Sequence, residues 1–99
     1  EMGSDVYEEI RYFGSRKKIF WVHFRNVVGT AENFGETFPD TGRVDMFEAM
    51  RAYDEISYES YLAPDHKLTM VDDTDWGHRY WGFALGYMRG LMQAVKKGK

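Results

Sequence analysis

The sequence predicts an α/β fold with parallel strands, because helical and strand-like segments alternate along its 99 residues. Three segments carry apolar residues at helical spacing, and two short apolar runs between them have the composition of buried strands. The expected order is helix, strand, helix, strand, helix. A chain of this length forms one small domain or a piece of a larger one.

The first helix is expected from about Asp5 to Phe13. Asp5 and Glu8 form a possible capping box at its start, and Gly14 suits its C-terminal cap. Ile19–Phe24 follows as a continuous apolar run rich in aromatic residues. A run without alternation predicts a strand that is covered on both faces, as in a parallel sheet.

The middle of the chain is expected to hold a long loop, from about Arg25 to Val44, because glycines and a proline interrupt it. The second helix is expected from about Asp45 to Ile56, where Asp45 and Glu48 form another possible capping box. A short second strand is expected at about Tyr61–Pro64.

The longest helix is expected from about Asp75 to Lys96, with one broad apolar stripe. Gly82, Gly86 and Gly90 lie four residues apart and therefore share one face of it. Each glycine costs a helix roughly 1 kcal/mol relative to alanine. The row therefore predicts close packing by another backbone.

The composition excludes several classes of protein. The net charge is -3 with acidic and basic residues mixed, and the absence of a basic stripe argues against nucleic acid as a partner. There is no cysteine for a disulfide or a thiolate ligand, and no apolar run has the length of a membrane span. A cytoplasmic location is expected. An aromatic content of 17% in so short a chain predicts apolar surface meant for a neighbour.

Two polar clusters occupy equivalent places in the predicted sheet. His23, Arg25 and Asn26 end the first strand, and Asp65 and His66 follow the second. Sites in parallel sheets lie at the C-terminal ends of the strands, so His23 and Asp65 can converge on one divalent metal such as Mn²⁺ or Zn²⁺. The alternatives are a hydrogen-bonded core histidine at His23 and a turn cap at Asp65.

Four stretches, in register along the chain, resemble the mannonate dehydratase family. They are Val22–Val27, Val44–Met46 with the helical Met50–Ala52 that follows, Pro64–His66 and Phe83–Leu91. Residues 1–3 and the run from Ile10 to Gly14 also fit the family's approach to the first of these stretches. The resemblance covers essentially the whole chain.

The resemblance implies a (β/α)8 TIM barrel, of which residues 1–99 would be a C-terminal fragment: a single partial-barrel domain made of the last two βα units and a preceding helix. The family removes water from D-mannonate to give 2-keto-3-deoxygluconate and uses a divalent metal, usually Mn²⁺. The missing strands would come from a longer chain or be replaced by self-association into a homo-oligomer.

The resemblance also implies roles for individual residues. His23 and Asp65 would be metal ligands, Arg25 and Asn26 would bind the sugar acid, and His66 would be an acid/base group. A guanidinium suits a sugar-acid carboxylate because its N–H groups form a planar fork.

The sequence departs from the family in two ways. The family's other metal ligands, a Cys and a His, belong to earlier strands, so half of the metal shell is missing and an isolated chain is expected to be inactive. The family's catalytic Tyr aligns with Trp76, which leaves His78 and Tyr80 as possible substitutes. Tyr80 is retained as the candidate catalytic residue, with packing on the helix stripe as its alternative.

Two other functions stay open at this point. One is a fragment of a related sugar isomerase or epimerase barrel, which shares the metal-ligand logic. The other is a small self-associating module without catalytic activity.

Overall fold

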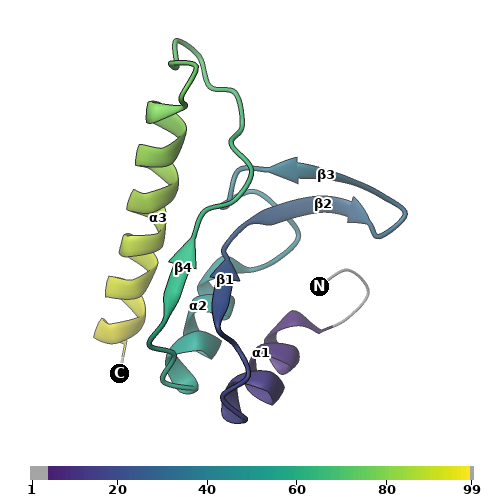
Figure 1. The fold of residues 1–99 in the computed structure, drawn as a ribbon, viewed down its shortest axis with the longest axis vertical. Coiled ribbons are helices and arrows are strands. Elements are labelled where there is room, and N and C mark those ends of the chain that lie inside the picture. The colour runs from purple at the N-terminus through teal and green to yellow at the C-terminus, as the bar shows by residue number, and fades with distance from the viewer. Residues whose placement is uncertain (1–4, 99) are drawn as a thin grey trace.

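The computed structural model describes residues 5–98 and confirms an α/β fold with parallel strands (Figure 1). The helices are α1 (Val6–Ser15), α2 (Met46–Glu55) and α3 (His78–Lys97). The strands are β1 (Trp21–His23), β2 (Asn26–Thr30), β3 (Asn33–Thr37) and β4 (Tyr61–Ala63). β1 and β4 pair in parallel, with Val22 opposite Leu62. The part of the resemblance carried by residues 1–3 lies outside the described residues.

The prediction of a long loop between Arg25 and Val44 is wrong for the first half of this segment, which forms an antiparallel hairpin. β2 pairs with β3 from Asn26↔Thr37 to Thr30↔Asn33. Gly29 has a φ of 99°, which favours glycine and lets the chain enter the tight turn. Much of the hairpin is exposed, so its sequence lacks the alternation that would identify half-buried strands.

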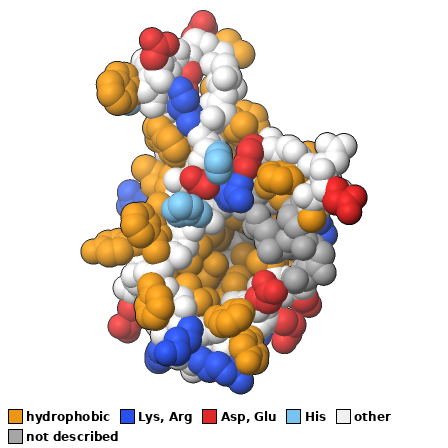
Figure 2. Space-filling view, turned by 45° about the vertical axis from the view of Figure 1, so that its right-hand side comes forward, with side chains coloured by type: hydrophobic (Ala, Val, Ile, Leu, Met, Phe, Trp, Pro, Cys, Tyr) orange, Lys and Arg blue, Asp and Glu red, His pale blue; other side chains and the backbone are white. Residues whose placement is uncertain are grey.

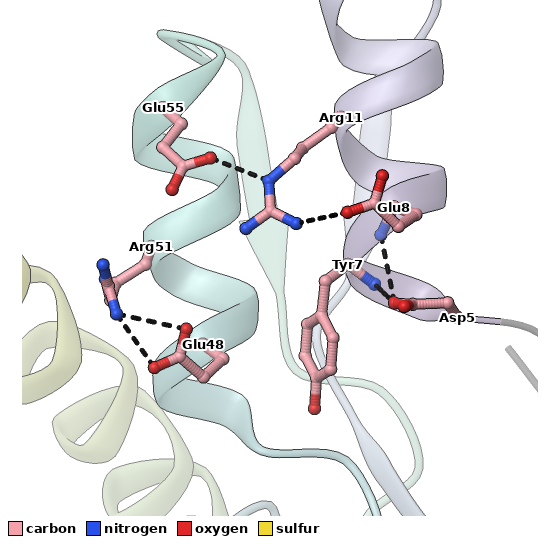
Figure 3. Close-up of polar contacts among 7 residues, drawn as sticks. All are labelled: Asp5, Tyr7, Glu8, Arg11, Glu48, Arg51 and Glu55. Atoms are coloured by element: carbon pink, nitrogen blue, oxygen red, sulfur yellow. Dashed lines mark hydrogen bonds and ion pairs between the residues drawn. The ribbon is translucent and has the colours of Figure 1, made fainter.

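Aspartates cap the first two helices as expected. Asp5 accepts hydrogen bonds from the backbone of Tyr7 and Glu8 at the start of α1 (Figure 3), and Asp45 caps α2 in the same way. Arg11 then joins the two helices, because its guanidinium bonds Glu8 on its own helix and Glu55 on α2. Glu55 accordingly has a lowered pKa, chiefly through the hydrogen bond from Arg11.

The third helix starts later than expected, and it lacks the capping aspartate that directly precedes α1 and α2. α3 begins at His78, and Gly77 before it adopts a left-handed conformation without a side-chain cap. Asp73 replaces the cap, since its carboxylate accepts from the backbone N–H groups of Arg79 and Tyr80. Burial raises the pKa of Asp73, but these backbone hydrogen bonds outweigh it and leave the pKa below its ordinary value.

The hydrophobic core lies between the helices and one face of the parallel strands, with α2 packed against both α1 and α3 (Figure 1). Its buried members are Ile10, Val22, Phe24, Met46, Ala49, Met50, Ala52, Met88, Leu91 and Val95. The first strand was expected to be covered on both faces. Within residues 5–98 only one face is covered, since the side chains of Trp21 and Tyr61 are 66% and 77% exposed.

Gly14 is not the helix cap that the sequence predicts, because α1 continues to Ser15. It is a buried contact point between two helices. A Cβ added at Gly14 would lie 2.1 Å from Cδ1 of Ile56 and 3.0 Å from two further carbons of that side chain. The glycine therefore allows Ile56 to pack directly against the backbone of α1.

The glycine row of α3 has the opposite environment. A Cβ added at Gly82, Gly86 or Gly90 would meet nothing within 4 Å in the part of the chain that the structure describes. The expected backbone neighbour is therefore not supplied by residues 5–98.

None of the helices within residues 5–98 combines the length and the apolar composition that a membrane span needs.

Candidate functional site

The parallel pairing of β1 and β4 brings the two predicted polar clusters together. His23 is in register with Ala63, and the backbone N–H of Phe24 donates to the carbonyl of Ala63 at 2.8 Å. Side chains that follow each strand therefore emerge at the same end of the sheet. Figure 2 shows histidine, acidic and basic side chains side by side on this face, with hydrophobic side chains around them.

The carboxylate of Asp65 is the centre of the cluster. Its Oδ2 lies 2.9 Å from Nε2 of His66, 3.4 Å from Nδ1 of His23 and 3.6 Å from Nε of Arg25. The side chains of Asp65 and Arg25 are 26% and 27% exposed, whereas both histidines are more than half exposed. Both imidazoles and the guanidinium thus converge on one partly shielded oxygen.

The hairpin adds an acidic residue that the sequence reasoning missed. Glu36 on β3 forms an ion pair with Arg25, and its Oε1 also lies 3.8 Å from Nε2 of His66. Glu36 pairs with Val27 across the hairpin. If a hairpin had been predicted for this segment, Glu36 would have been expected beside the end of β1. Because a loop was predicted instead, the position of Glu36 could not be inferred from the sequence.

Asn26 has a structural role that the sequence reasoning missed. Its side chain is 1% exposed, and its amide nitrogen donates to the carbonyls of Pro39 and Val44 at 3.0 and 2.8 Å. Its amide oxygen accepts from the backbone N–H groups of Val27 and Val44. This amide, with both its oxygen and its nitrogen hydrogen-bonded, anchors the hairpin to the segment that enters α2. The substrate-binding role expected for Asn26 stays a prediction.

The backbone at His66 is unusual. Its φ of 35° lies in the left-handed region, directly after Pro64 and Asp65. Non-glycine residues held in such conformations cluster at functional sites, where the surrounding structure holds them in place. The imidazole of His66 lies 2.9 Å from the carboxylate of the preceding residue.

Tyr80 borders the cluster from α3. It is 3% exposed, and its ring packs on Phe38 at a centroid distance of 6.0 Å. Burial raises the pKa of the Tyr80 phenol, and the negative charges of Glu36 and Asp65 raise it further. The ring is thus buried in packing contacts, and the charges of the two carboxylates favour the protonated form of the phenol.

The other two residues considered for that place lie elsewhere. Trp76 is 79% exposed in the loop before α3. His78 is the first residue of α3, and its Nδ1 lies 2.9 Å from the hydroxyl of Thr74 in the loop before the helix. Neither residue has a contact with Asp65 among those described for residues 5–98.

The donor set fits a divalent metal in part. His23 and Asp65 offer an imidazole nitrogen and a carboxylate oxygen, a combination that suits Mn²⁺ or Zn²⁺. No group of three or more His, Cys, Asp or Glu side chains within residues 5–98 is arranged to hold a metal ion.

Comparison with known proteins gives one consistent family. The sequence model of the D-mannonate dehydratase (UxuA) family matches residues 1–99. Mannonate dehydratase from Thermotoga neapolitana is 38% identical over 102 residues, which cover 97% of this chain. That from Lachnoclostridium phytofermentans is 32% identical over 100 residues, covering 95% of this chain.

The fold leads to the same family. The crystal structure of mannonate dehydratase from Streptococcus suis serotype 2 is similar with a TM-score of 0.83 and 27% identity. The match covers 95% of this chain and 29% of that one. The chain spans 28% of the length of each of the two relatives named above.

Proposed function

Because this chain belongs to the D-mannonate dehydratase family, we propose that it is the C-terminal part of a metal-dependent enzyme that converts D-mannonate to 2-keto-3-deoxygluconate and water. The observation that carries the proposal is the convergence of His23, Arg25 and His66 on Asp65. These side chains lie at the C-terminal ends of two neighbouring parallel strands, where barrel enzymes have their active sites.

The reaction defines what the site must provide. A base removes the proton from C2, next to the carboxylate, and an acid protonates the hydroxyl that leaves C3 as water. A C2–C3 double bond forms, and the resulting enol rearranges to the 2-keto product. Negative charge develops on the carboxylate during proton removal, so the site must also stabilise an enediolate.

The side chains of this segment suit several of these tasks. We assign the binding of the sugar-acid carboxylate to Arg25, because a guanidinium matches a carboxylate in shape and charge. We assign one proton transfer to His66, whose more than half-exposed imidazole is in contact with Asp65. Tyr80 holds a neutral phenol beside these groups, which makes it a candidate proton donor.

His23 and Asp65 would hold the metal, for which Mn²⁺ is our first candidate. When bound, such an ion stabilises the negative charge that develops on the substrate's oxygens. The remaining ligands would come from strands outside this segment. For that reason the chain alone should bind Mn²⁺ weakly and should not turn over D-mannonate.

Metal titration tests this assignment directly. Mn²⁺ binding to the chain can be followed by the loss of the free-ion signal in electron paramagnetic resonance. The double variant His23→Ala, Asp65→Ala should bind much less Mn²⁺, whereas a matched variant His78→Ala, Asp75→Ala should bind as the parent does. Equal Mn²⁺ affinity in all three proteins would remove the metal assignment. Clear turnover of D-mannonate by the chain alone would refute the claim that half of the site is missing.

The open face of the parallel strands supports a further part of the proposal. Trp21 and Tyr61 expose large aromatic surfaces on it, and the two-stranded sheet has two unpaired edges within residues 5–98. Exposed edges recruit further strands. We therefore propose that the face is covered by the rest of a barrel, or by further copies of this chain when it is isolated. Light scattering that gives a monomeric mass, together with cooperative unfolding, would contradict self-association.

A further inference from the structure

We infer that Glu36 is a positioning residue of the proposed site, which fixes the direction of the Arg25 guanidinium. The inference rests on the proposed function for its meaning in catalysis. Its structural content rests on the contacts of Glu36 alone and can be tested without activity.

The hairpin delivers Glu36 to the site from one side. Asn26 anchors the start of β2 in the core, and the β2–β3 register places Glu36 opposite Val27. The side chain of Glu36 is 24% exposed, so the residue is shielded from much of the solvent. Its position is therefore set by the backbone pairing of the hairpin and by a buried anchor.

Arg25 lies between two carboxylates. Glu36 pairs with a terminal nitrogen of the guanidinium, and Oδ2 of Asp65 lies 3.6 Å from its Nε. A guanidinium is planar and rigid, so the contact of one terminal nitrogen with Glu36, with Asp65 near Nε, restricts the orientation of the whole group. Loss of the Glu36 carboxylate removes one partner of that terminal nitrogen, which gives the long side chain of Arg25 more freedom to turn.

This arrangement has a consequence for Asp65. The positive charge of Arg25 faces Glu36 as well as Asp65, so Asp65 is not the only carboxylate near the guanidinium. The same Oε1 of Glu36 lies 3.8 Å from Nε2 of His66. One carboxylate thus borders both the proposed carboxylate-binding side chain and the proposed proton-transfer side chain, and it sets their spacing.

Nuclear magnetic resonance of the ¹⁵N-labelled chain measures the effect on Arg25. Hindered rotation about the bonds from Cζ to the terminal nitrogens should give Arg25 separate Nη resonances, unlike those of the exposed Arg89. Glu36→Ala should accelerate this rotation by roughly tenfold or more, as expected for the loss of one charge-assisted hydrogen bond. Glu36→Gln keeps an acceptor oxygen at the same position and should restore part of the hindrance.

Two controls separate positioning from folding. Glu32→Ala removes an exposed glutamate from the turn of the same hairpin and should leave the Arg25 resonances unchanged. The backbone amide resonances of β2 and β3 report whether the hairpin is intact in each variant, and Glu36→Gln keeps the test usable if alanine disturbs it. An unchanged rotation rate in Glu36→Ala with an intact hairpin would overturn the inference. Failure of the proposed metal site would appear in the Mn²⁺ titration instead.

Discussion

Replacing Asn26 by alanine separates the structural role seen here from the substrate-binding role that the sequence suggests. The side chain of Asn26 makes four hydrogen bonds to backbone groups, including two with Val44. Gly42 lies against it so closely that a Cβ added there would be 2.2 Å from the Asn26 amide. The amide therefore fills its space as well as satisfying its neighbours.

The magnitude follows from the burial of these bonds. Those with Pro39 and Val27 are buried, whereas the two with Val44 are partly buried. A buried backbone group that loses its partner costs about 1–3 kcal/mol. Water can reach the partly buried groups and replace their partner in the variant. We therefore expect Asn26→Ala to lower the free energy of unfolding by about 3 kcal/mol.

Urea denaturation followed by tryptophan fluorescence gives this free energy, and the hairpin amide resonances show where the damage lies. Asn33→Ala, on the exposed strand of the same hairpin, is the matched control and should stay within about 0.5 kcal/mol of the parent. If Asn26→Ala is as stable as the control, the anchoring role is wrong. If it also loses a sugar-acid contact while remaining fully stable, the original interpretation is restored.

Three further predictions concern helices and ionisable groups. Gly14→Ala should lower the free energy of unfolding by about 1 kcal/mol, because the clash with Ile56 costs more than the gain in helix propensity. Gly86→Ala should raise the free energy of unfolding by up to about 1 kcal/mol. Urea unfolding of both variants checks this, and equal effects would contradict it. Asp73 has a lowered pKa despite its burial, so its stabilising contribution is present above the ordinary value of 3.8 and is lost as the pH falls below it. In thermal unfolding from pH 5 to 2, the melting temperature of Asp73→Asn should therefore fall less with pH than that of the parent. Burial, and secondarily two nearby carboxylates, raise the pKa of Tyr80, so the unfolded chain releases this proton first and stability falls as the pH rises above 10.0. Tyr80→Phe should lose less stability above that pH when unfolding is measured at a series of alkaline pH values. The same loss of stability in both proteins would count against a raised pKa at Tyr80.

Local signals in the sequence were sufficient for most of the fold. Asp5 and Asp45 marked helix starts correctly, because a capping aspartate acts on backbone groups within three residues of itself. The start of α3 was misplaced by three residues, since Asp73 caps it from beyond a left-handed glycine. Gly14 was misread because its constraint comes from Ile56, which is distant in the sequence.

The site was predictable where it depends on the parallel strands. His23 and Asp65 were expected to converge because strand ends meet at one edge of a sheet, and they do. The position of Glu36 and the structural role of Asn26 were both missed for one shared reason. Both roles depend on a hairpin with little apolar alternation, so nothing in the local pattern indicated which side chains it would bring inward.

The pairing of β1 with β4 has a consequence for the order in which the site forms. The Arg25–Glu36 contact spans 11 residues of chain, whereas the contact of Ser60 with Phe20, at the start of the parallel pair, spans 40. Hairpins form within microseconds, and longer loops close more slowly because their entropic cost is higher. We expect Arg25 and Glu36 to meet early in folding and Asp65 to join them late. An intact Asp65–His23 contact would then report that the chain has completed its folding.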